Sequence, residues 1–417
     1  MIFSLEVRRA RKGDCLLLHF GTSKKPGLVL IDGGPSAVYG PHLKPRLTQI
    51  REARGIGPGK PLPVDMLMVS HVDDDHIKGI LDLTRELLET PQGQARMLRI
   101  MRLWHNSFDE IIGKDPKELT AALAGSQFGA AALTGDLPDD AALDTDEDDE
   151  TVRDSLMVLA GIPQGHQLRG DAEKLGIQLP GKLVMSGNKL KMGTLQFVVA
   201  GPMKAELKKL QDKHDKWLKE KKDEDAESAL AAYADTSVPN LSSIVVYAKS
   251  GDRTMLLTGD ARGDRILRGL EQAKVIPKGG SLEVDVLKMP HHGSARNLET
   301  DFFERIAAKH YVFSGNGEHG NPERESLEML FAARGDKPFE IHLTYPIDEI
   351  DPEREADWKK EQAKEKKRGG KVRENWSQEK HSLRAFFAKT RLRPDQKIRI
   401  VDAGNPHLIE LGDPLGY

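Results

Sequence analysis

A short segment, residues 66–80, constrains more than any other what this chain can form. It begins with an apolar run, Met66–Val69, that is typical of a buried strand. The chain then places two histidines and three aspartates within six positions, HVDDDH over 71–76. Apolar spacing resumes at Ile77 and Ile80, as on a helix that covers a sheet. A strand that ends in such a turn presents its side chains at the edge where ligands bind in α/β folds.

The residue types of this turn indicate a divalent cation. Adjacent carboxylates repel one another, and burying them without a compensating charge is costly. Imidazole and carboxylate ligands suit zinc or manganese, and the only cysteine, Cys15, excludes a cysteine-based zinc site. A solvated loop that caps a helix is the simpler interpretation, but a cap needs one aspartate and no histidine. We therefore predict a metal site.

Two later strands end in residues of the same kind. Thr254–Leu257 leads to Asp260, and Val284–Met289 leads to His291 and His292. These side chains and those of 71–76 are enough for two divalent ions, with Asp260 placed to bridge them. The predicted chemistry is hydrolysis by an activated water. A serine nucleophile would need a motif such as G-x-S-x-G, which the sequence lacks.

Strand patterns also occur at both ends of the chain. The early strands end at Asp32-Gly33-Gly34, where Asp32 could cap the turn or brace the metal loop, and a structural role is favoured. A predicted strand over 96–104 ends beside His105, which is expected to be a structural histidine rather than a ligand. Leu183–Met185 is a further predicted strand. Ile398–Val401 and Leu408–Leu411 are predicted to form a closing hairpin.

The order of these motifs resembles the metallo-β-lactamase superfamily. Within it, the chain is similar to the hydrolase domain of ComEC-type DNA-uptake proteins and their soluble relatives. The resemblance covers residues 1–105 and 180–335, through the motifs LIDGG at 30–34, SHVDDDH at 70–76, LLTGD at 256–260 and LKMPHHGS at 287–294. It implies an α/β (α+β) fold, a four-layer αββα sandwich with charged helical insertions.

The resemblance also implies a set of metal ligands. One ion would be held by Asp75, His76 and either His291 or His292, the other by His71 and Asp73, with Asp260 as the bridge. Spacing before the glycine favours His292 as the ligand and leaves His291 near the substrate. The superfamily's isolated middle histidine is replaced, if at all, by His105 or His166. A single tightly held ion is therefore the alternative to two.

A late loop completes the predicted site. Residues 319–322, HGNP, resemble a loop in which the relatives often carry a histidine beside the proline; here Asn321 takes that place. The resemblance makes Asp75, His291 and His319 the predicted catalytic residues. Predicted substrate contacts are Ser294, Asn316 and Asn321.

Length and charge set the remaining expectations. The 417 residues carry a net charge of -3, which gives no overall attraction to nucleic acid or membranes. No apolar run approaches the ~20 residues that span a bilayer, and the start lacks a signal-peptide pattern, so a cytoplasmic location is expected. We expect a single domain over 1–417. Its additions are an insertion at about 114–180 with an acidic tract over 136–154, a helical arm at about 204–236 and a charged C-terminal extension at about 348–390.

The predicted function is that of a metal-dependent phosphodiesterase or nuclease acting on DNA or another phosphodiester. A hydrolase of a small ester, lactone or thioester is the alternative enzyme, and a catalytically weak scaffold in a larger assembly is the alternative class. The charged insertions fit contacts with a protein partner. The basic stretch 364–373, near Trp376, is expected to be solvated, but it could supply phosphate contacts and a stacking face.

Overall fold

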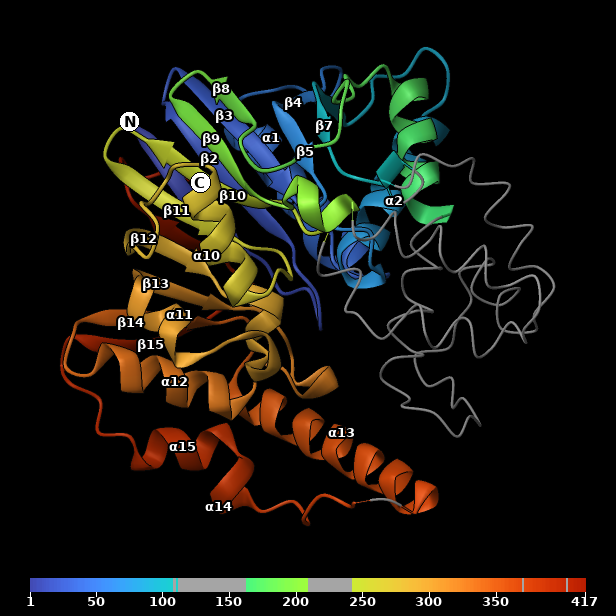
Figure 1. The fold of residues 1–417 in the computed structure, drawn as a ribbon. Helices are drawn as coiled ribbons and strands as arrows, with labels where there is room; N and C mark the ends of the chain where they lie inside the picture. The colour runs from blue at the N-terminus through green and yellow to red at the C-terminus, as the bar shows by residue number, and fades with distance from the viewer. Residues whose placement is uncertain (108–109, 112–162, 209–241, 370, 403) are drawn as a thin grey trace.

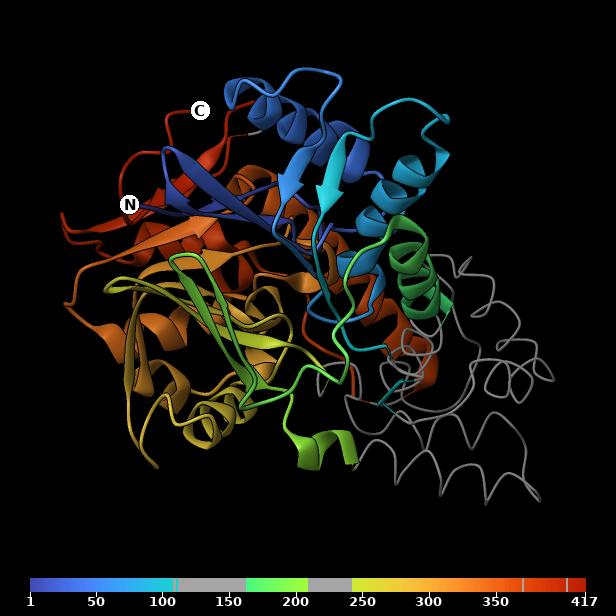
Figure 2. The same cartoon turned by 90° about the horizontal axis from the view of Figure 1, so that it is seen from above.

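Two large sheets pack face to face, with helices on the outer face of each (Figure 1, Figure 2). The computed structural model describes residues 1–107, 110–111, 163–208, 242–369, 371–402 and 404–417. This arrangement confirms the predicted α/β (α+β) fold with αββα layers. The predictions for the acidic tract, for most of the insertion at about 114–180 and for the helical arm beyond residue 208 lie outside the described residues.

The six-stranded sheet combines the N-terminal strands with the last strand of the chain. In spatial order it contains β16 (His407–Glu410), β1 (Ile2–Val7), β2 (Leu16–Thr22), β3 (Lys25–Ile31), β5 (Met66–Met68) and β7 (Leu103–Trp104). The strands from β16 to β3 are antiparallel, whereas β5 and β7 are parallel to β3. The carboxyl ends of β3 and β5 therefore lie at one edge of the sheet.

The eight-stranded sheet contains the second half of the chain. Its strands are β15 (Gln396–Ile400), β14 (Phe339–Leu343), β13 (Ile306–Phe313), β12 (Leu282–Lys288), β11 (Arg253–Leu257), β10 (Val245–Ser250), β9 (Leu195–Gly201) and β8 (Lys189–Met192). The run from β11 to β15 is parallel, so the carboxyl ends of these strands also meet at one edge. A separate small sheet pairs β4 (Leu62–Val64) with β6 (Leu98–Ile100).

Helices cover the two outer faces. Those on the six-stranded sheet are η1 (Tyr39–Leu43), α1 (Lys44–Ala53), α2 (Asp74–Glu89) and a helix over 163–175. Those on the eight-stranded sheet are α10 (Gly263–Gln272), α11 (Thr300–Arg305) and α12 (Arg324–Arg334), followed by α13 (Ile347–Arg368), α14 (Gln378–His381) and α15 (Leu383–Lys389). Short helical turns are η2 (Pro290–Gly293), η3 (Ala295–Asn297) and η4 (Glu318–Gly320).

The core between the sheets follows from the alternation of strand residues. Phe3 and Leu18 from one sheet share an apolar cluster with Phe197 and Val286 from the other. Separate apolar clusters lie between each sheet and its helices. Within the described part of the chain, we find no helix that combines the length and apolarity needed to cross a membrane.

Three strand predictions were wrong in detail. The strand expected over 96–104 is divided into β6 and β7, which belong to different sheets. Residues 183–185 are not in a strand. The expected C-terminal hairpin does not form, because β15 pairs with β14 in one sheet and β16 pairs with β1 in the other. Local alternation identifies a strand but does not choose its partner.

Candidate metal centre

The turn after β5 directs two of its three aspartates inward. Asp73 stands at the N-cap of α2, but its side chain makes no capping hydrogen bond. Its Oδ2 lies 3.4 Å from Nε2 of His71 instead. Asp74 points away and pairs with Lys78, 2.5 Å from Oδ2 to Nζ. The interpretation of Asp73 as a solvated helix cap is therefore excluded.

Two other strand exits bring their side chains to the same place. Asp260 follows β11, and its Oδ1 lies 3.4 Å from Nε2 of His76 while its Oδ2 lies 3.7 Å from Nε2 of His71. His292 follows β12, and its Nε2 lies 3.3 Å from Asp260 Oδ2 and 3.4 Å from Asp75 Oδ2. Strand ends that are far apart in the sequence thus form one cluster of imidazoles and carboxylates.

The cluster contains two groups of potential ligands at the strand exits and a third group behind them. The first two are Asp75, His76, Asp260 and His292, and His71, Asp73 and Asp75; the third is Asp14, Asp32 and His76, and in each group the ligand atoms all lie within 4.8 Å of one another. Asp260 contacts histidines of both groups at the strand exits. The resemblance predicts Asp75 with one ion only and Asp260 as the bridge, whereas here Asp75 is the residue that these two groups share. The roles of the individual residues as ligands stay predictions.

His291 and His292 occupy different positions at the end of β12. Nε2 of His291 is 3.7 Å from Asp260 Oδ2, but its side chain is 33% exposed, compared with 2% for His292. Both residues have positive φ, 45° and 55°, a region that costs free energy for residues with a side chain. This strained turn places one histidine inside the cluster and the other at its surface.

Hydrogen bonds at the outer nitrogens orient the three inner imidazoles. Nδ1 of His76 lies 2.9 Å from Oδ2 of Asp32, and Nδ1 of His292 lies 3.0 Å from Oγ of Ser314. Nδ1 of His71 lies 3.1 Å from Oγ of Ser70, which donates to Asp32. If each Nδ1 carries the proton, each Nε2 is free to bind a metal, an arrangement common among metal-binding histidines. Asp32 therefore braces the metal loop.

Sequence analysis missed a buried ion pair beside this cluster. Lys288, the last residue of β12, is 1% exposed, and its Nζ lies 2.5 Å from Oδ2 of Asp14 and 3.9 Å from Oδ1 of Asp260. Oδ1 of Asp14 lies 3.5 Å from Nδ1 of His292. The preceding residue, Gly13, leaves no room for a side chain, because a Cβ would lie 1.8 Å from the carbonyl oxygen of Asp75. The first turn of the chain is thus packed under the start of α2.

The unsatisfied atoms of the cluster fit a divalent metal. Among the described residues, several of its buried side-chain atoms have no hydrogen-bond partner: Oδ1 of Asp73 and of Asp260, and Nε2 of His71, His76 and His292. Buried polar atoms are rarely left without a partner unless they have a role such as binding an ion. The donor set of imidazoles and carboxylates is the one that zinc and manganese accept.

The cluster has an excess of negative charge, which bound cations would compensate. Five aspartates gather there, Asp14, Asp32, Asp73, Asp75 and Asp260, against one lysine among the described residues, Lys288. With neutral imidazoles, four negative charges remain uncompensated, which two divalent ions would balance. Burial lowers the pKa of His292, but Asp260 and Asp14 outweigh it and raise that pKa to about 10. Burial likewise lowers the pKa of His76, yet Asp260, Asp75 and Asp32 raise it well above its usual value.

Burial and the neighbouring charges also shift the pKa values of the carboxylates. Burial raises the pKa of Asp75 and of Asp260, but the neighbouring histidines outweigh it and hold both below the usual range. Asp75 and Asp260 therefore stay ionised, as ligands of a cation must. In this part of the molecule, protons on the histidines and divalent ions are alternative ways to compensate the same negative charge.

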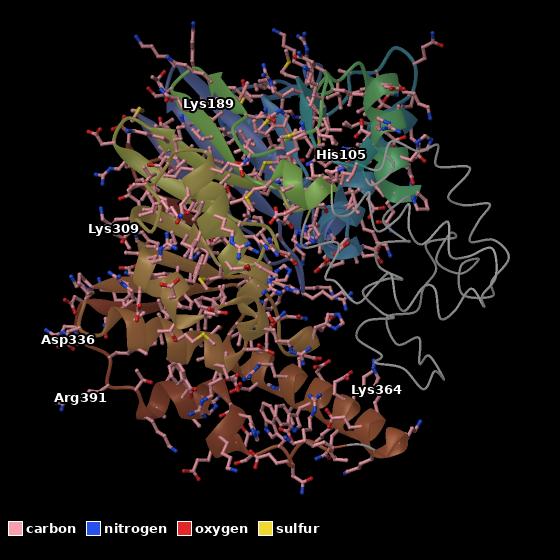
Figure 3. The ribbon with its side chains drawn as sticks, viewed as in Figure 1. His105, Lys189, Lys309, Asp336, Lys364 and Arg391 are labelled. Atoms are coloured by element: carbon pink, nitrogen blue, oxygen red, sulfur yellow. The ribbon has the colours of Figure 1, made fainter. Side chains whose placement is uncertain are left out.

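Neither substitute for the middle histidine lies in the two ligand groups. His105, labelled in Figure 3, is buried, and its Nε2 lies 3.1 Å from the carbonyl oxygen of Gly165. Burial lowers the pKa of His105, so the ring is neutral. Nδ1 of His166 lies 3.2 Å from the guanidinium of Arg169, on the exposed side of the helix over 163–175. The hydrogen bond of His105 fits the structural role expected for it.

The late loop packs against the histidine turn. A Cβ at Gly293 would lie 3.2 Å from Cβ of Pro322, which places the loop beside His292. Oδ1 of Asn321 is buried and has no hydrogen-bond partner among the described residues. Nδ2 of Asn316 donates to Glu318, 2.7 Å away, so that side chain stabilises the loop.

The remaining predicted contacts lie in or near this loop. His319 lies in η4 with a positive φ of 58°. Ser294 is buried directly after the histidine turn. Their contacts with a substrate stay predictions.

The αββα layers and the strand order decide the type of fold. The fold is metallo-β-lactamase-like. No family model matches the chain. Its likeness to solved structures is weak: a beta-lactamase domain protein from Burkholderia ambifaria is 14% identical with a TM-score of 0.27 and covers 62% of this chain and 51% of that one. The MIM-2 metallo-beta-lactamase is 15% identical with a TM-score of 0.27 and covers 69% of this chain and 77% of that one.

Similarity to curated proteins is confined to short segments. ComE operon protein 3 of Bacillus subtilis is 29% identical over 100 residues, which are 23% of this chain and 12% of that protein. Microtubule-associated protein 1A of Rattus norvegicus is 39% identical over 61 residues, 14% of this chain and 2% of that protein. The chain thus spans at most 12% of the length of these relatives. Assignment of the metallo-β-lactamase-like fold therefore rests on the layers and the strand order.

Proposed function

We propose that this chain is a metal-dependent hydrolase that cleaves phosphodiesters, with DNA as the substrate class. The observation that carries the proposal is the pair of ligand groups that meet at Asp75 and Asp260. The metals would be held by His71 and Asp73 on one side and by His76 and His292 on the other. Bound divalent ions supply Lewis acidity and make water a nucleophile near neutral pH.

The chain's own residues contribute orientation and proton handling. Asp75 and Asp260 hold the two ligand groups together, while Asp32, Ser70 and Ser314 fix the direction of the imidazoles. His291 borders the cluster and is partly exposed, so we assign it the substrate-side proton. We place His319 on the same side through the loop that packs on Gly293.

Guanidinium groups suit the binding of phosphate oxygens, and two lie close in sequence to the cluster. Both are paired with carboxylates, Arg11 with Glu318 at 2.9 Å and Arg262 with Asp264 at 3.1 Å, so a phosphodiester would have to exchange these pairs. The motif resemblance to ComEC-type DNA-uptake proteins supports a phosphodiester as the substrate class. The alternatives are a hydrolase of a small ester, lactone or thioester, and a scaffold with little activity.

The deciding experiment combines metal content with substrate choice. Protein purified without added metal would be analysed for bound elements, then assayed in manganese and in zinc. The substrates would be single-stranded DNA, nicked DNA, bis(p-nitrophenyl) phosphate, p-nitrophenyl acetate and a lactone. We expect close to two metals per chain and cleavage of the phosphodiesters.

Neighbouring aspartates provide matched variants. Asp75→Ala and Asp260→Ala should reduce cleavage to background, whereas Asp74→Asn should retain it, because Asp74 points away and pairs with Lys78. Hydrolysis of the ester or lactone alone would favour the alternative enzyme. Metal binding without any hydrolysis would favour the scaffold, and full activity in Asp75→Ala would refute the site.

A further inference from the structure

Three histidines from three strands form a hydrogen-bonded line away from the candidate metal centre. Nδ1 of His310 on β13 lies 3.0 Å from Nε2 of His342 on β14. Nδ1 of His342 lies 2.7 Å from Nε2 of His407 on β16. Because β16 belongs to the six-stranded sheet, this line joins the two sheets. It shares no residue with the two ligand groups at the strand exits.

Strand register explains why a carboxylate joins the line. His310 is the partner of Glu340 between β13 and β14, and His342 is two residues further along β14. Residues that alternate along a strand lie on one face, so the side chains of Glu340 and His342 share the face of His310. One ligand atom from each of His310, Glu340 and His342 lies within 4.8 Å of the others. His310 and Glu340 are only partly buried, which leaves a path for an ion.

We propose that His310, Glu340 and His342 bind a divalent transition-metal ion of the zinc class, with His407 as an outer hydrogen-bond acceptor. Two histidines and a carboxylate are an established ligand set for zinc when water completes the shell. Two nitrogens that each bind one tetrahedral ion at 2.0–2.1 Å lie about 3.3 Å apart. The observed separation of 3.0 Å needs an adjustment of only a few tenths of an ångström.

Protonation of the three imidazoles suits this role. Burial lowers the pKa of His342 to about 2, and burial also lowers the pKa of His310 and of His407, so all three rings are neutral at pH 7. If Nδ1–H of His342 donates to His407, Nε2 of His342 keeps a free lone pair. Binding at Nδ1 of His310 requires only that its proton move to Nε2 of the same ring. No proton is released, and the metal replaces one hydrogen bond.

Nearby cations oppose the ion and give the proposal a signature. Nε of Arg399 lies 3.1 Å from Oε2 of Glu340, and Nζ of Lys397 lies 3.5 Å from Oε1. These charges weaken the attraction of Glu340 for a second cation. Replacing Arg399 with glutamine should therefore tighten zinc binding. A purely structural network of histidines has no reason to show this effect.

The test uses the full chain with the candidate centre disabled. Asp75→Ala/Asp260→Ala protein would be titrated with zinc by calorimetry, and the stoichiometry would be checked by elemental analysis after dialysis. We expect one zinc to bind in a manner that depends on His310 and His342. Adding His310→Gln or His342→Gln should remove that zinc, and His407→Ala should weaken its binding roughly 10- to 100-fold. His166→Gln, on an exposed helix, is the matched control and should change nothing.

Each result supports or overturns the proposal. Loss of one zinc in the His310 and His342 variants, together with tighter binding in Arg399→Gln, supports it. The proposal is overturned if the His310→Gln or His342→Gln variant folds and still binds the same zinc. It is also overturned if the Asp75→Ala/Asp260→Ala protein binds no zinc. If His342→Gln does not fold, Glu340→Gln serves in its place, because it keeps the amide oxygen for Arg399 and removes the charge that the ion needs. The result does not depend on whether the centre at Asp260 hydrolyses a phosphodiester.

Discussion

Lys288 offers the sharpest test of how the candidate centre is balanced. Its ammonium is 1% exposed and lies 2.5 Å from Asp14, which is itself 1% exposed. Lys288→Met keeps the volume and removes the charge, so Asp14 is left buried without its partner. Breaking a buried ion pair in this way typically costs about 3–5 kcal/mol. We expect the free energy of unfolding to fall by about that amount in protein stripped of metal with a chelator.

Added metal should raise the free energy of unfolding of Lys288→Met. Nζ of Lys288 lies 3.9 Å from Asp260, so its removal leaves one more uncompensated negative charge for a divalent ion to balance. Lys288→Met should bind zinc or manganese more tightly than the natural chain and should regain more stability when metal is added, since a ligand that binds only the folded state stabilises it.

Denaturant unfolding followed by circular dichroism measures both effects. Asp14→Asn and the Asp14→Asn/Lys288→Met pair complete a double-mutant cycle. The double variant should be more stable than Lys288→Met alone, because no uncompensated charge remains. The reasoning is refuted if Lys288→Met loses less than about 1 kcal/mol without metal, or if the second substitution destabilises further.

Three further predictions concern the surrounding structure. Burial raises the pKa of Glu6, but His19 and Arg46 lower it more strongly, to about 2 from 4.5. Glu6 therefore contributes about 3 kcal/mol of stability above pH 4.5 that is lost as the pH falls toward 2. Glu6→Gln should flatten the dependence of thermal stability on pH over that range, and an unchanged slope would contradict this prediction. His105→Ala should retain the metal content and the activity of the natural chain. If elemental analysis shows that the variant has lost a metal, His105 is a ligand. Arg354 is buried, and its Nη1 lies 3.4 Å from Oδ1 of the buried Asp351. Arg354→Met should therefore lower the free energy of unfolding by about 3–5 kcal/mol and reduce activity, measured by calorimetry and steady-state kinetics; an unchanged melting temperature would contradict it.

The main features of the candidate centre could be predicted from sequence because they lie at strand exits. An apolar run followed by His71, Asp75 and His76, or by Asp260, or by His292, is visible in the order of residues alone. The carboxyl ends of β11 and β12 meet at one edge because these strands are parallel neighbours, so Asp260 and His292 converge. β5 belongs to the other sheet, so its turn reaches them only because the two sheets pack face to face. Asp73 and Asp75 face the cluster and Asp74 faces away from it. Helix geometry predicts this difference only once the start of α2 is known.

Other features depend on contacts that no local pattern shows. Asp14 follows a glycine in a turn, and nothing nearby in the sequence indicates that this turn packs under α2 and meets Lys288. His342 and His407 are 65 residues apart and belong to different sheets. The wrong C-terminal hairpin has the same origin, since β15 and β16 both alternate but pair with strands in separate sheets.

The C-terminal extension shows most clearly how charge alone misleads. Its composition predicts solvated helices, yet α13 buries Arg354, whose Nε donates to the carbonyl oxygen of Gly320 at 3.0 Å in the loop of His319. The guanidinium of Arg354 also lies 5.6 Å from the ring centre of Trp376, and that ring packs on His381. Trp376 thus packs within the extension, and a stacking face for bases there stays a prediction. Because the extension supports the loop beside the candidate centre, its removal should impair the site as well as the fold.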